Sequence, residues 1–176
     1  LPVYHEFIAK HGEWLRLSST GKILAKSRLP GAGHPAVAII NDEQAVAFLR
    51  DTGSSPNTLR AMATADSGAH WQPGEALATV NPNAPVALLR LKSGRLLLAG
   101  NPPTGRQAIL LWLSADQGKT WQEMRTVESA PDGGADYGNP SLLLGRDGRI
   151  HLAYDWRQQG IKHVVFSEAW IDGGQP

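Results

Sequence analysis

The chain has 176 residues, of which 17 are basic and 16 acidic, and its formal net charge is +1. This balance gives no reason to expect a nucleic acid or a membrane surface as partner, and the lack of cysteine excludes disulfides and thiolate metal sites. No apolar stretch reaches the roughly 18 residues of a membrane-spanning helix.

The predicted elements recur in one order: an apolar run, a polar turn, a second apolar run, a loop and a third apolar run. Before the first repeat, residues 13–29 (EWLRLSSTGKILAKSRL) predict a hairpin around Ser19–Gly21. The opening runs begin at His34, Pro85 and Asn139, the second runs end at Arg50, Asn101 and Asp155, and the third runs span 58–64, 108–114 and 161–167. Short runs rich in Val, Leu and Ile between Gly, Asn and Asp turns are typical of strands. We expect no helix, because Gly or Pro breaks the alternations too often.

A local motif, Ser/Thr-Ala-Asp-x-Gly-x-x-Trp, occurs twice, as TADSGAHW at 64–71 and as SADQGKTW at 114–121. The spacing of fifty residues indicates a modular array. The Ser/Thr and Asp side chains can bond nearby backbone amides, the Gly can adopt positive φ, and the Trp can pack against the last hairpin. We therefore predict structural roles for Asp66, Asp116, Trp71 and Trp121.

Three units of four short antiparallel strands at this period predict an all-β chain built from β-propeller blades. We expect a single domain over residues 1–176. Within it, residues 1–30 would be the tail of a preceding blade, followed by blades at 31–80 and 81–135 and by a closing blade at 136–176.

SADQGKTW resembles the Asp-box of sialidases, the bacterial neuraminidase repeat, and TADSGAHW is a degenerate copy. Residues 137–170 are similar to the closing segment of sialidase-like proteins, which runs Tyr-Ser-Tyr-Pro, Asp-Gly-Arg-Ile-His-Leu and Ile-Lys-His-Val. The resemblance implies a six-bladed propeller, of which this chain supplies about three four-stranded blades as the C-terminal half. It also implies an acidic sugar or glycan as ligand. The missing half would be lost, expressed separately, or replaced by a second copy of this chain.

Sialidases hold the substrate carboxylate with three arginines, because a planar guanidinium pairs bidentately with a carboxylate. They use a Tyr nucleophile assisted by a Glu, and an Asp as the acid. The resemblance implies that the first arginine and the Asp belong to the half that this chain does not supply. It implies substrate-binding roles for Arg50, at the end of its strand, and for Arg106, eight residues before the Ser of the second box.

The nucleophile side departs from the family pattern. His34 stands sixteen residues before Arg50, where the assisting Glu is expected, and Asn139 stands in the column of the Tyr. Tyr137 lies two positions earlier, nearly 7 Å along a strand, so it would reach the site only if the loop is rearranged, with His34 as its base. Asp155 matches the Glu that orients an arginine in sialidases. The catalytic candidates are Tyr137, His34 and Asp155, and Asn139 joins the substrate-binding residues.

Three functions remain open at this stage. The first is the C-terminal part of a sialidase-like exo-glycosidase on acidic sugars, inactive as this chain. The second is a polysaccharide lyase on the same scaffold, and the third is a non-catalytic glycan-binding or assembly module. We expect no cofactor and no metal, since His151 and His163 could pair across a sheet without a third ligand in view. We expect a soluble protein of the bacterial cytoplasm or periplasm.

Overall fold

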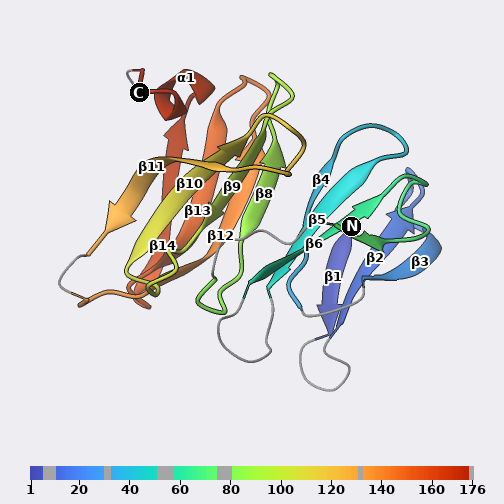
Figure 1. Ribbon diagram of the computed structural model, residues 1–176, viewed down its shortest axis with the longest axis horizontal. Coiled ribbons are helices and arrows are strands. Elements are labelled where there is room, and N and C mark those ends of the chain that lie inside the picture. The colour runs from blue at the N-terminus through green and yellow to red at the C-terminus, as the bar shows by residue number, and fades with distance from the viewer. Residues whose placement is uncertain (6–10, 30–32, 51–57, 75–80, 131–132, 175–176) are drawn as a thin grey trace. The chain divides into compact units, whose positions relative to one another are not determined.

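The computed structural model describes residues 1–5, 11–29, 33–50, 58–74, 81–130 and 133–174, and the structural statements below concern these residues. They form fourteen strands in four antiparallel sheets, and one four-residue helix (Figure 1). The chain divides into two compact units, unit 1 (Leu1–Asn83) and unit 2 (Ala84–Pro176), which are described separately. The expectation of an all-β chain made of small sheets is confirmed. No helix in these ranges has the length and apolarity needed to cross a membrane.

Unit 1 contains two sheets whose strands follow chain order. The first sheet is β1 (Pro2–His5), β2 (His11–Leu17) and β3 (Ile23–Leu29), and the second is β4 (Ala36–Ile39), β5 (Ala45–Arg50), β6 (Leu59–Thr64) and β7 (Gln72–Pro73). The β2–β3 turn lies where the sequence predicted a hairpin. The Ser18 amide donates to the Lys22 carbonyl at 2.8 Å, and Gly21 takes a φ of 81°, a conformation that costs glycine little.

The core of unit 1 joins side chains from both of its sheets. Leu29 of β3 is fully buried in one cluster with Ala47 and Leu49 of β5 and Met62 of β6. Four of the six residues of β5 are buried, and the strand pairs with β4 on one side and with β6 on the other. Its sequence, AVAFLR, is accordingly an apolar run and not a strict alternation.

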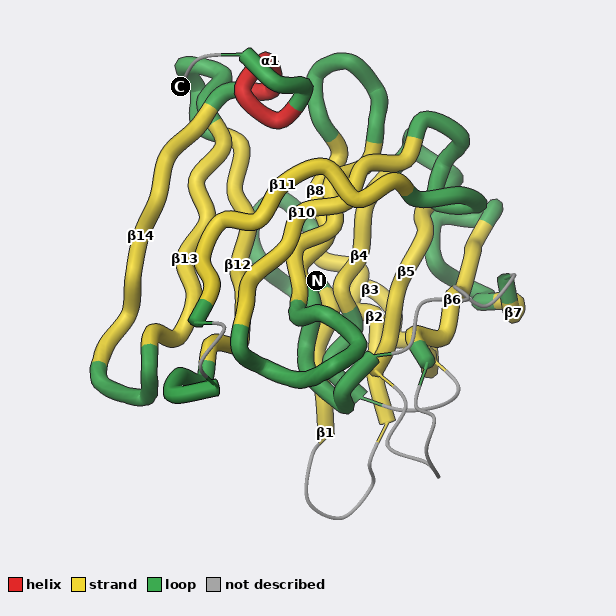
Figure 2. The backbone as a smooth tube through the Cα atoms, turned by 60° about the vertical axis from the view of Figure 1, so that its left-hand side comes forward, coloured by secondary structure: helices red, strands yellow, loops and turns green. Residues whose placement is uncertain are grey.

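Unit 2 also contains two sheets, and it ends in the helix. The first sheet is β8 (Ala87–Arg90), β9 (Leu96–Gly100), β10 (Ala108–Ser114) and β11 (Gln122–Ser129); the second is β12 (Tyr137–Leu144), β13 (Ile150–Trp156) and β14 (Gly160–Phe166), followed by α1 (Glu168–Ile171). Figure 2 shows β12, β13 and β14 side by side in chain order. All residues of β9 and β10 are buried.

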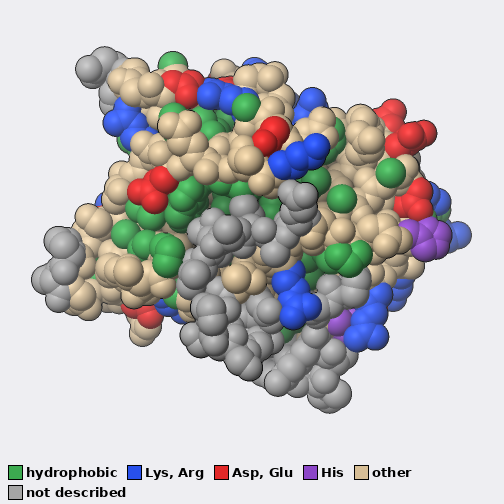
Figure 3. Space-filling model, viewed as in Figure 1, with side chains coloured by type: hydrophobic (Ala, Val, Ile, Leu, Met, Phe, Trp, Pro, Cys, Tyr) green, Lys and Arg blue, Asp and Glu red, His purple; other side chains and the backbone are tan. Residues whose placement is uncertain are grey.

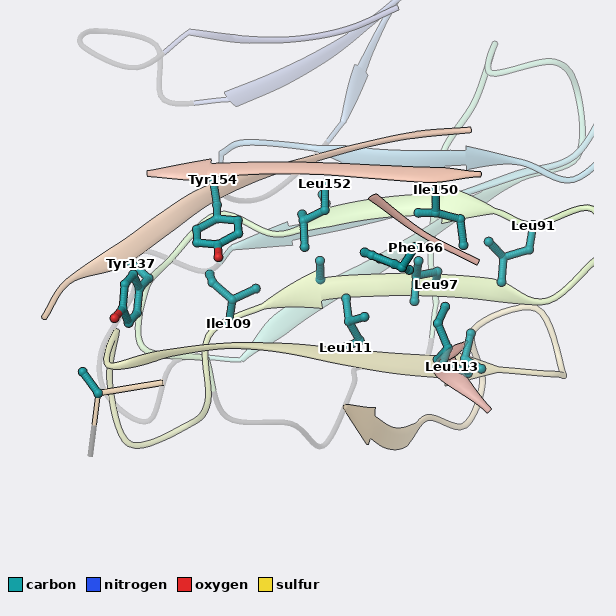
Figure 4. Packing of buried hydrophobic residues seen from close by; sticks show 14 residues of the cluster. Leu91, Leu97, Ile109, Leu111, Leu113, Tyr137, Ile150, Leu152, Tyr154 and Phe166 are labelled. Carbon is teal, nitrogen blue, oxygen red and sulfur yellow. The ribbon is translucent and has the colours of Figure 1, made fainter. Parts of the chain in front are cut away.

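The core of unit 2 lies between these two sheets. Leu97, Ile109 and Leu111 of β9 and β10 point toward Ile150 and Leu152 of β13 (Figure 4). Each of these five side chains is at most 1% exposed. Full burial of one such side chain contributes about 1.5–3 kcal/mol, so this layer fixes how β10 and β13 lie against each other.

The helix α1 corrects the expectation that the chain has no helix. The Ser167 hydroxyl accepts a hydrogen bond from the Trp170 amide at 3.1 Å, and Glu168 lies in the first turn. Arg95, in the β8–β9 turn, donates to Glu168 at 2.7 and 2.9 Å and to Asp172 at 2.7 and 2.8 Å. The helix forms because a serine cap and this tertiary contact compensate for its shortness.

Candidate functional site

The two predicted Asp turns have the same hydrogen-bond network. In the second turn the Ser114 hydroxyl donates to Asp116 at 2.8 Å and accepts from the Gly118 amide at 2.8 Å. Asp116 also accepts from the Thr120 amide at 2.9 Å and the Thr120 hydroxyl at 2.6 Å. The Thr120 hydroxyl contributes most to lowering the pKa of Asp116 to about 2, followed by its amide and by Ser114. The carboxylate thus closes the turn.

In the first turn, Thr64, Asp66 and His70 take the corresponding places. Thr64 donates to Asp66 at 2.8 Å, and the His70 amide and Nδ1 contact the carboxylate at 2.9 and 2.7 Å. These bonds, the His70 amide first, hold the pKa of Asp66 well below its ordinary range. Gly68 and Gly118 both have positive φ, 82° and 93°. The geometry agrees with the predicted structural role of the motif.

The two motif tryptophans differ in burial. Trp71 is 6% exposed, belongs to the core cluster of unit 1, and meets Trp14 edge-on with ring centroids 5.9 Å apart. Trp121 is half-buried, and its indole Nε1 donates to the Gly118 carbonyl at 3.0 Å. Trp71 therefore packs between two sheets, whereas Trp121 stabilises the turn in which it lies.

At one end of unit 2, the β9–β10 loop meets the start of β12. The Tyr137 amide donates to the Arg106 carbonyl at 2.8 Å, and Arg106 Nε lies 3.2 Å from Asp136 Oδ1. Asp136 Oδ2 accepts from the Gln158 amide group at 2.9 Å. A Cβ on Gly138 would lie 2.0 Å from Arg106 Nη2. The guanidinium therefore lies over a glycine that leaves room for it.

Asn139 and Asp155 lie beside this cluster. The strand pair β12–β13 has a register irregularity between Gly138 and Ser141, and Asn139 has a φ of 47°. Its side-chain amide donates to Asp155 Oδ2 at 2.5 Å, while Gly138 pairs with Asp155 in the register. The structure thus places Arg106, Asn139 and Asp155 around Gly138 at one end of unit 2, and their roles at a substrate site stay a prediction.

Tyr137 lies in the core of unit 2. The residue is 0% exposed, and its ring meets that of Tyr154 edge-on at 6.3 Å (Figure 4). Its hydroxyl has no hydrogen-bond partner among the residues that the structure describes. Burial, and then the hydrogen bond to Glu128, raise the pKa of Tyr154 above its ordinary value. As described here, Tyr137 does not offer its hydroxyl to a ligand in solvent.

In unit 1 the structure brings His34 and Arg50 to one end of the β4–β5 pair. The Arg50 amide donates to the Gly33 carbonyl at 3.2 Å, and Arg50 Nη1 donates to the Asn83 carbonyl at 3.3 Å. The ring of His34 lies 4.4 Å from that of Tyr4, a residue that no sequence signal had singled out. The convergence of this group with the Arg106 cluster in unit 2 stays a prediction.

Within the described ranges, one group of three side chains, His5, His11 and Glu13, could together hold a metal ion. The sequence prediction missed this group because no motif spacing marks it. The predicted cross-strand pair is present: His151 Nδ1 lies 3.0 Å from His163 Nε2, and the rings stack at 5.2 Å. In Figure 3, acidic and basic side chains are interspersed over the visible face.

Small antiparallel sheets, two of which have an Asp-box turn between their last two strands, define a protein of the sialidase-like β-propeller class, as the sequence predicted. Residues 1–152 match the family model of the BNR repeat-like domain, and the chain belongs to this family. No curated protein matches the chain.

Solved structures support the same fold. A K499G mutant of the NanB sialidase from Streptococcus pneumoniae matches with a TM-score of 0.69 at 13% identity, over 92% of this chain and 28% of that chain. Trypanosoma rangeli sialidase matches with a TM-score of 0.63 at 13% identity, over 89% and 26%. The α-L-arabinofuranosidase Arb93A from Fusarium graminearum matches with a TM-score of 0.59 at 16% identity, over 77% and 45%. The chain thus spans less than half the length of each of these proteins.

Proposed function

We propose that this chain forms the C-terminal part of a sialidase-like glycoside hydrolase and that Arg50 and Arg106 bind the carboxylate of an acidic sugar. The observation that carries the proposal is the placement of Arg106. Asp136 contacts its Nε at 3.2 Å, and Gly138 leaves space beneath Nη2. The ion pair with Asp136 involves Nε, so the two terminal nitrogens are the natural contacts for a planar carboxylate.

Arg50 occupies the corresponding strand end in unit 1. The Arg50 amide donates to the Gly33 carbonyl, which holds the backbone of this residue in place. Arg50 Nη1 donates to the Asn83 carbonyl, which directs the side chain. A second guanidinium would strengthen the binding of a carboxylate, because the arginine stays charged at every physiological pH. In the proposed site Arg50 supplies this group.

We expect binding without hydrolysis. Asn139 stands in the column where sialidases carry the Tyr nucleophile, and an amide cannot take that role. Tyr137 is fully buried, so its hydroxyl does not replace the missing nucleophile. Asp155 is engaged by Asn139 at 2.5 Å, which suits an orienting role better than a nucleophilic one.

The non-catalytic glycan-binding module is the second candidate, and the same Asn139–Asp155 pair favours it. An amide and a carboxylate at the end of two strands are typical hydrogen-bonding groups for sugar hydroxyls. The lyase alternative gains no support, because it needs an accessible Tyr137 hydroxyl.

The proposed partner is the remaining set of blades, from a longer chain or from a second copy. The outer face of β12–β14 carries Leu143, which is 64% exposed, Ile161, which is 78% exposed, and Val165. His151 and His163 lie between these aliphatic side chains on the same face, and we propose that another element covers this face. Solution mass by light scattering, compared with that of an Ile161→Lys variant, tests the second-copy form.

The binding proposal is tested with N-acetylneuraminic acid and glucuronic acid as probes, by ligand-detected NMR on the 176-residue chain. Arg106→Lys keeps the positive charge but removes the planar guanidinium with its two terminal nitrogens. We therefore expect the affinity for the sugar probes to fall at least about tenfold, the scale of one good charge-assisted hydrogen bond. Arg146→Lys, in the exposed turn at the opposite end of β12–β13, is the matched control. Equal affinities in both variants, or no uptake of either probe by the parent chain, would contradict the proposal.

A further inference from the structure

The strand pair β1–β2 places two histidines and a glutamate on one face of its sheet. His5 ends β1 and pairs directly with His11, the first residue of β2. Glu13 lies two residues beyond His11, and side chains two apart on a strand point to the same side. Tyr4 and Gly12 alternate with them and point to the opposite side, where a Cβ on Gly12 would meet Leu29 and Pro35.

The three side chains converge at short range. His5 Nε2 lies 3.2 Å from Glu13 Oε2, and His11 Nε2 lies 3.3 Å from Glu13 Oε1. The two imidazole rings stack with centroids 4.7 Å apart and an interplanar angle of 25°. Three potential ligand atoms, one imidazole nitrogen from each histidine and one carboxylate oxygen from Glu13, lie within 4.8 Å of one another.

These separations fit a transition-metal ion. Zinc binds imidazole nitrogen and carboxylate oxygen at about 2.0–2.2 Å in a tetrahedron, which places neighbouring ligand atoms about 3.4 Å apart. The two nitrogen–oxygen distances, 3.2 and 3.3 Å, are close to that value, although they end on different oxygens of the Glu13 carboxylate, so the carboxylate faces both imidazoles. Imidazoles with one carboxylate suit zinc and its neighbours in the first row, whereas magnesium and calcium prefer oxygen ligands throughout.

All three side chains of the cluster are at least partly open to solvent. The side chains of His11 and Glu13 are 14% and 24% exposed, and that of His5 is 47% exposed. Solvent can reach the cluster through His5.

We propose that His5, His11 and Glu13 form a binding site for a divalent transition-metal ion, with Zn²⁺ as the best fit. The ion would join the end of β1 to the start of β2 and keep a fourth position for water or another ligand. This site lies apart from the proposed sugar-binding residues of unit 2 in sequence, and it stands independently of the proposed function.

The test uses the untagged 176-residue chain, titrated calorimetrically with ZnCl₂ in metal-free buffer near pH 7.5. We expect about one ion per chain and a rise in the unfolding temperature with zinc, because a ligand that binds the folded state stabilises it. His5→Ala and Glu13→Gln change partly exposed side chains and should each weaken binding by more than about tenfold, since even groups that only support a metal ligand have effects of that size. His163→Ala, which removes the other histidine pair, is the matched control and should bind zinc like the parent chain.

Three results would overturn the site: no uptake by the folded parent chain, unchanged affinity in both His5→Ala and Glu13→Gln, or a loss confined to His163→Ala. Far-UV circular dichroism of each variant establishes that it has folded. Co²⁺ absorption gives a second readout, because its visible d–d bands report the coordination geometry of the bound ion; these bands should be lost in Glu13→Gln and His5→Ala alike.

Discussion

The two motif tryptophans should contribute very unequally to stability, although the sequence presents them as equivalents. We consider Trp71→Ala and Trp121→Ala as paired truncations. Trp71 is 6% exposed and lies in the core cluster that joins the two sheets of unit 1, in edge contact with Trp14. Trp121 is half-buried beside its own turn.

The magnitudes follow from this difference in burial. Truncation of a buried Trp to Ala costs about 3–5 kcal/mol, and an edge-on aromatic pair adds to the upper part of that range. We therefore expect a loss of about 4 kcal/mol for Trp71→Ala. Trp121→Ala forfeits a partly buried ring and the bond to the Gly118 carbonyl, for about 1–2 kcal/mol. A difference of about 2 kcal/mol corresponds to roughly 10 °C in unfolding temperature for a unit of this size.

The assay is urea denaturation followed by far-UV circular dichroism, with hydrogen exchange to locate the loosened strands. Trp71→Ala should raise exchange in β4–β6, while Trp121→Ala should raise it in β10 and β11. Trp71→Phe is the control: it keeps a buried ring, and the Trp71 indole nitrogen makes no hydrogen bond among the described residues, so little should be lost. If Trp121→Ala destabilises the chain as much as Trp71→Ala, the structural distinction between the two boxes is wrong.

Three further predictions concern single contacts. Gly138→Ala should displace the Arg106 guanidinium, because the new Cβ would lie 2.0 Å from Nη2; the fold should persist by circular dichroism while the affinity for an acidic sugar falls. The Asp116 carboxylate should titrate by NMR near pH 2, and in Thr120→Val its pKa should move toward the ordinary value of 3.8. The contribution of this carboxylate to stability is therefore complete above about pH 4 and is lost as the pH falls toward 2. An unchanged titration midpoint in Thr120→Val would contradict the assignment of Thr120 as the main cause. Arg95→Met removes the bonds that hold α1 and should cost about 1–2 kcal/mol, seen as faster hydrogen exchange at 168–172 with β13 unchanged.

The strands and the Asp turns could be predicted because their determinants are local. The apolar runs and the turns between them specify which face is buried, and the Ser114–Asp116–Thr120 network involves residues at most six apart. The start of β12 shows the limit. The sequence placed it at Asn139, but pairing begins at Tyr137 and continues through a register irregularity, where Asn139 and Pro140 lie opposite the single residue Tyr154.

The helix and the metal-ligand cluster escaped prediction for different reasons. Helix α1 has only four residues, too few for a periodic signal, and it depends on Arg95, more than seventy residues earlier in the chain. His5 and His11 meet because β1 and β2 pair in one particular register. A shift by one residue would place His5 on the opposite face from His11 and Glu13, and nothing in the sequence of this hairpin fixes the register by itself.

The ends of the second strands show why the repeat predicts positions better than chemistry. Arg50, Asn101 and Asp155 occupy the same place in three successive repeats. Arg50 donates to the Asn83 carbonyl, Asn101 is buried and donates to the carbonyls of Ala108 and Tyr137 at 2.8 and 2.9 Å, and Asp155 accepts from Asn139. Arg50 and Asn101 reach segments outside their own hairpins, whereas Asp155 contacts the strand paired with its own, so the role of each side chain depends on which segment the fold brings to it. A functional assignment in this family therefore has to be made one strand end at a time, from the contacts that each side chain makes.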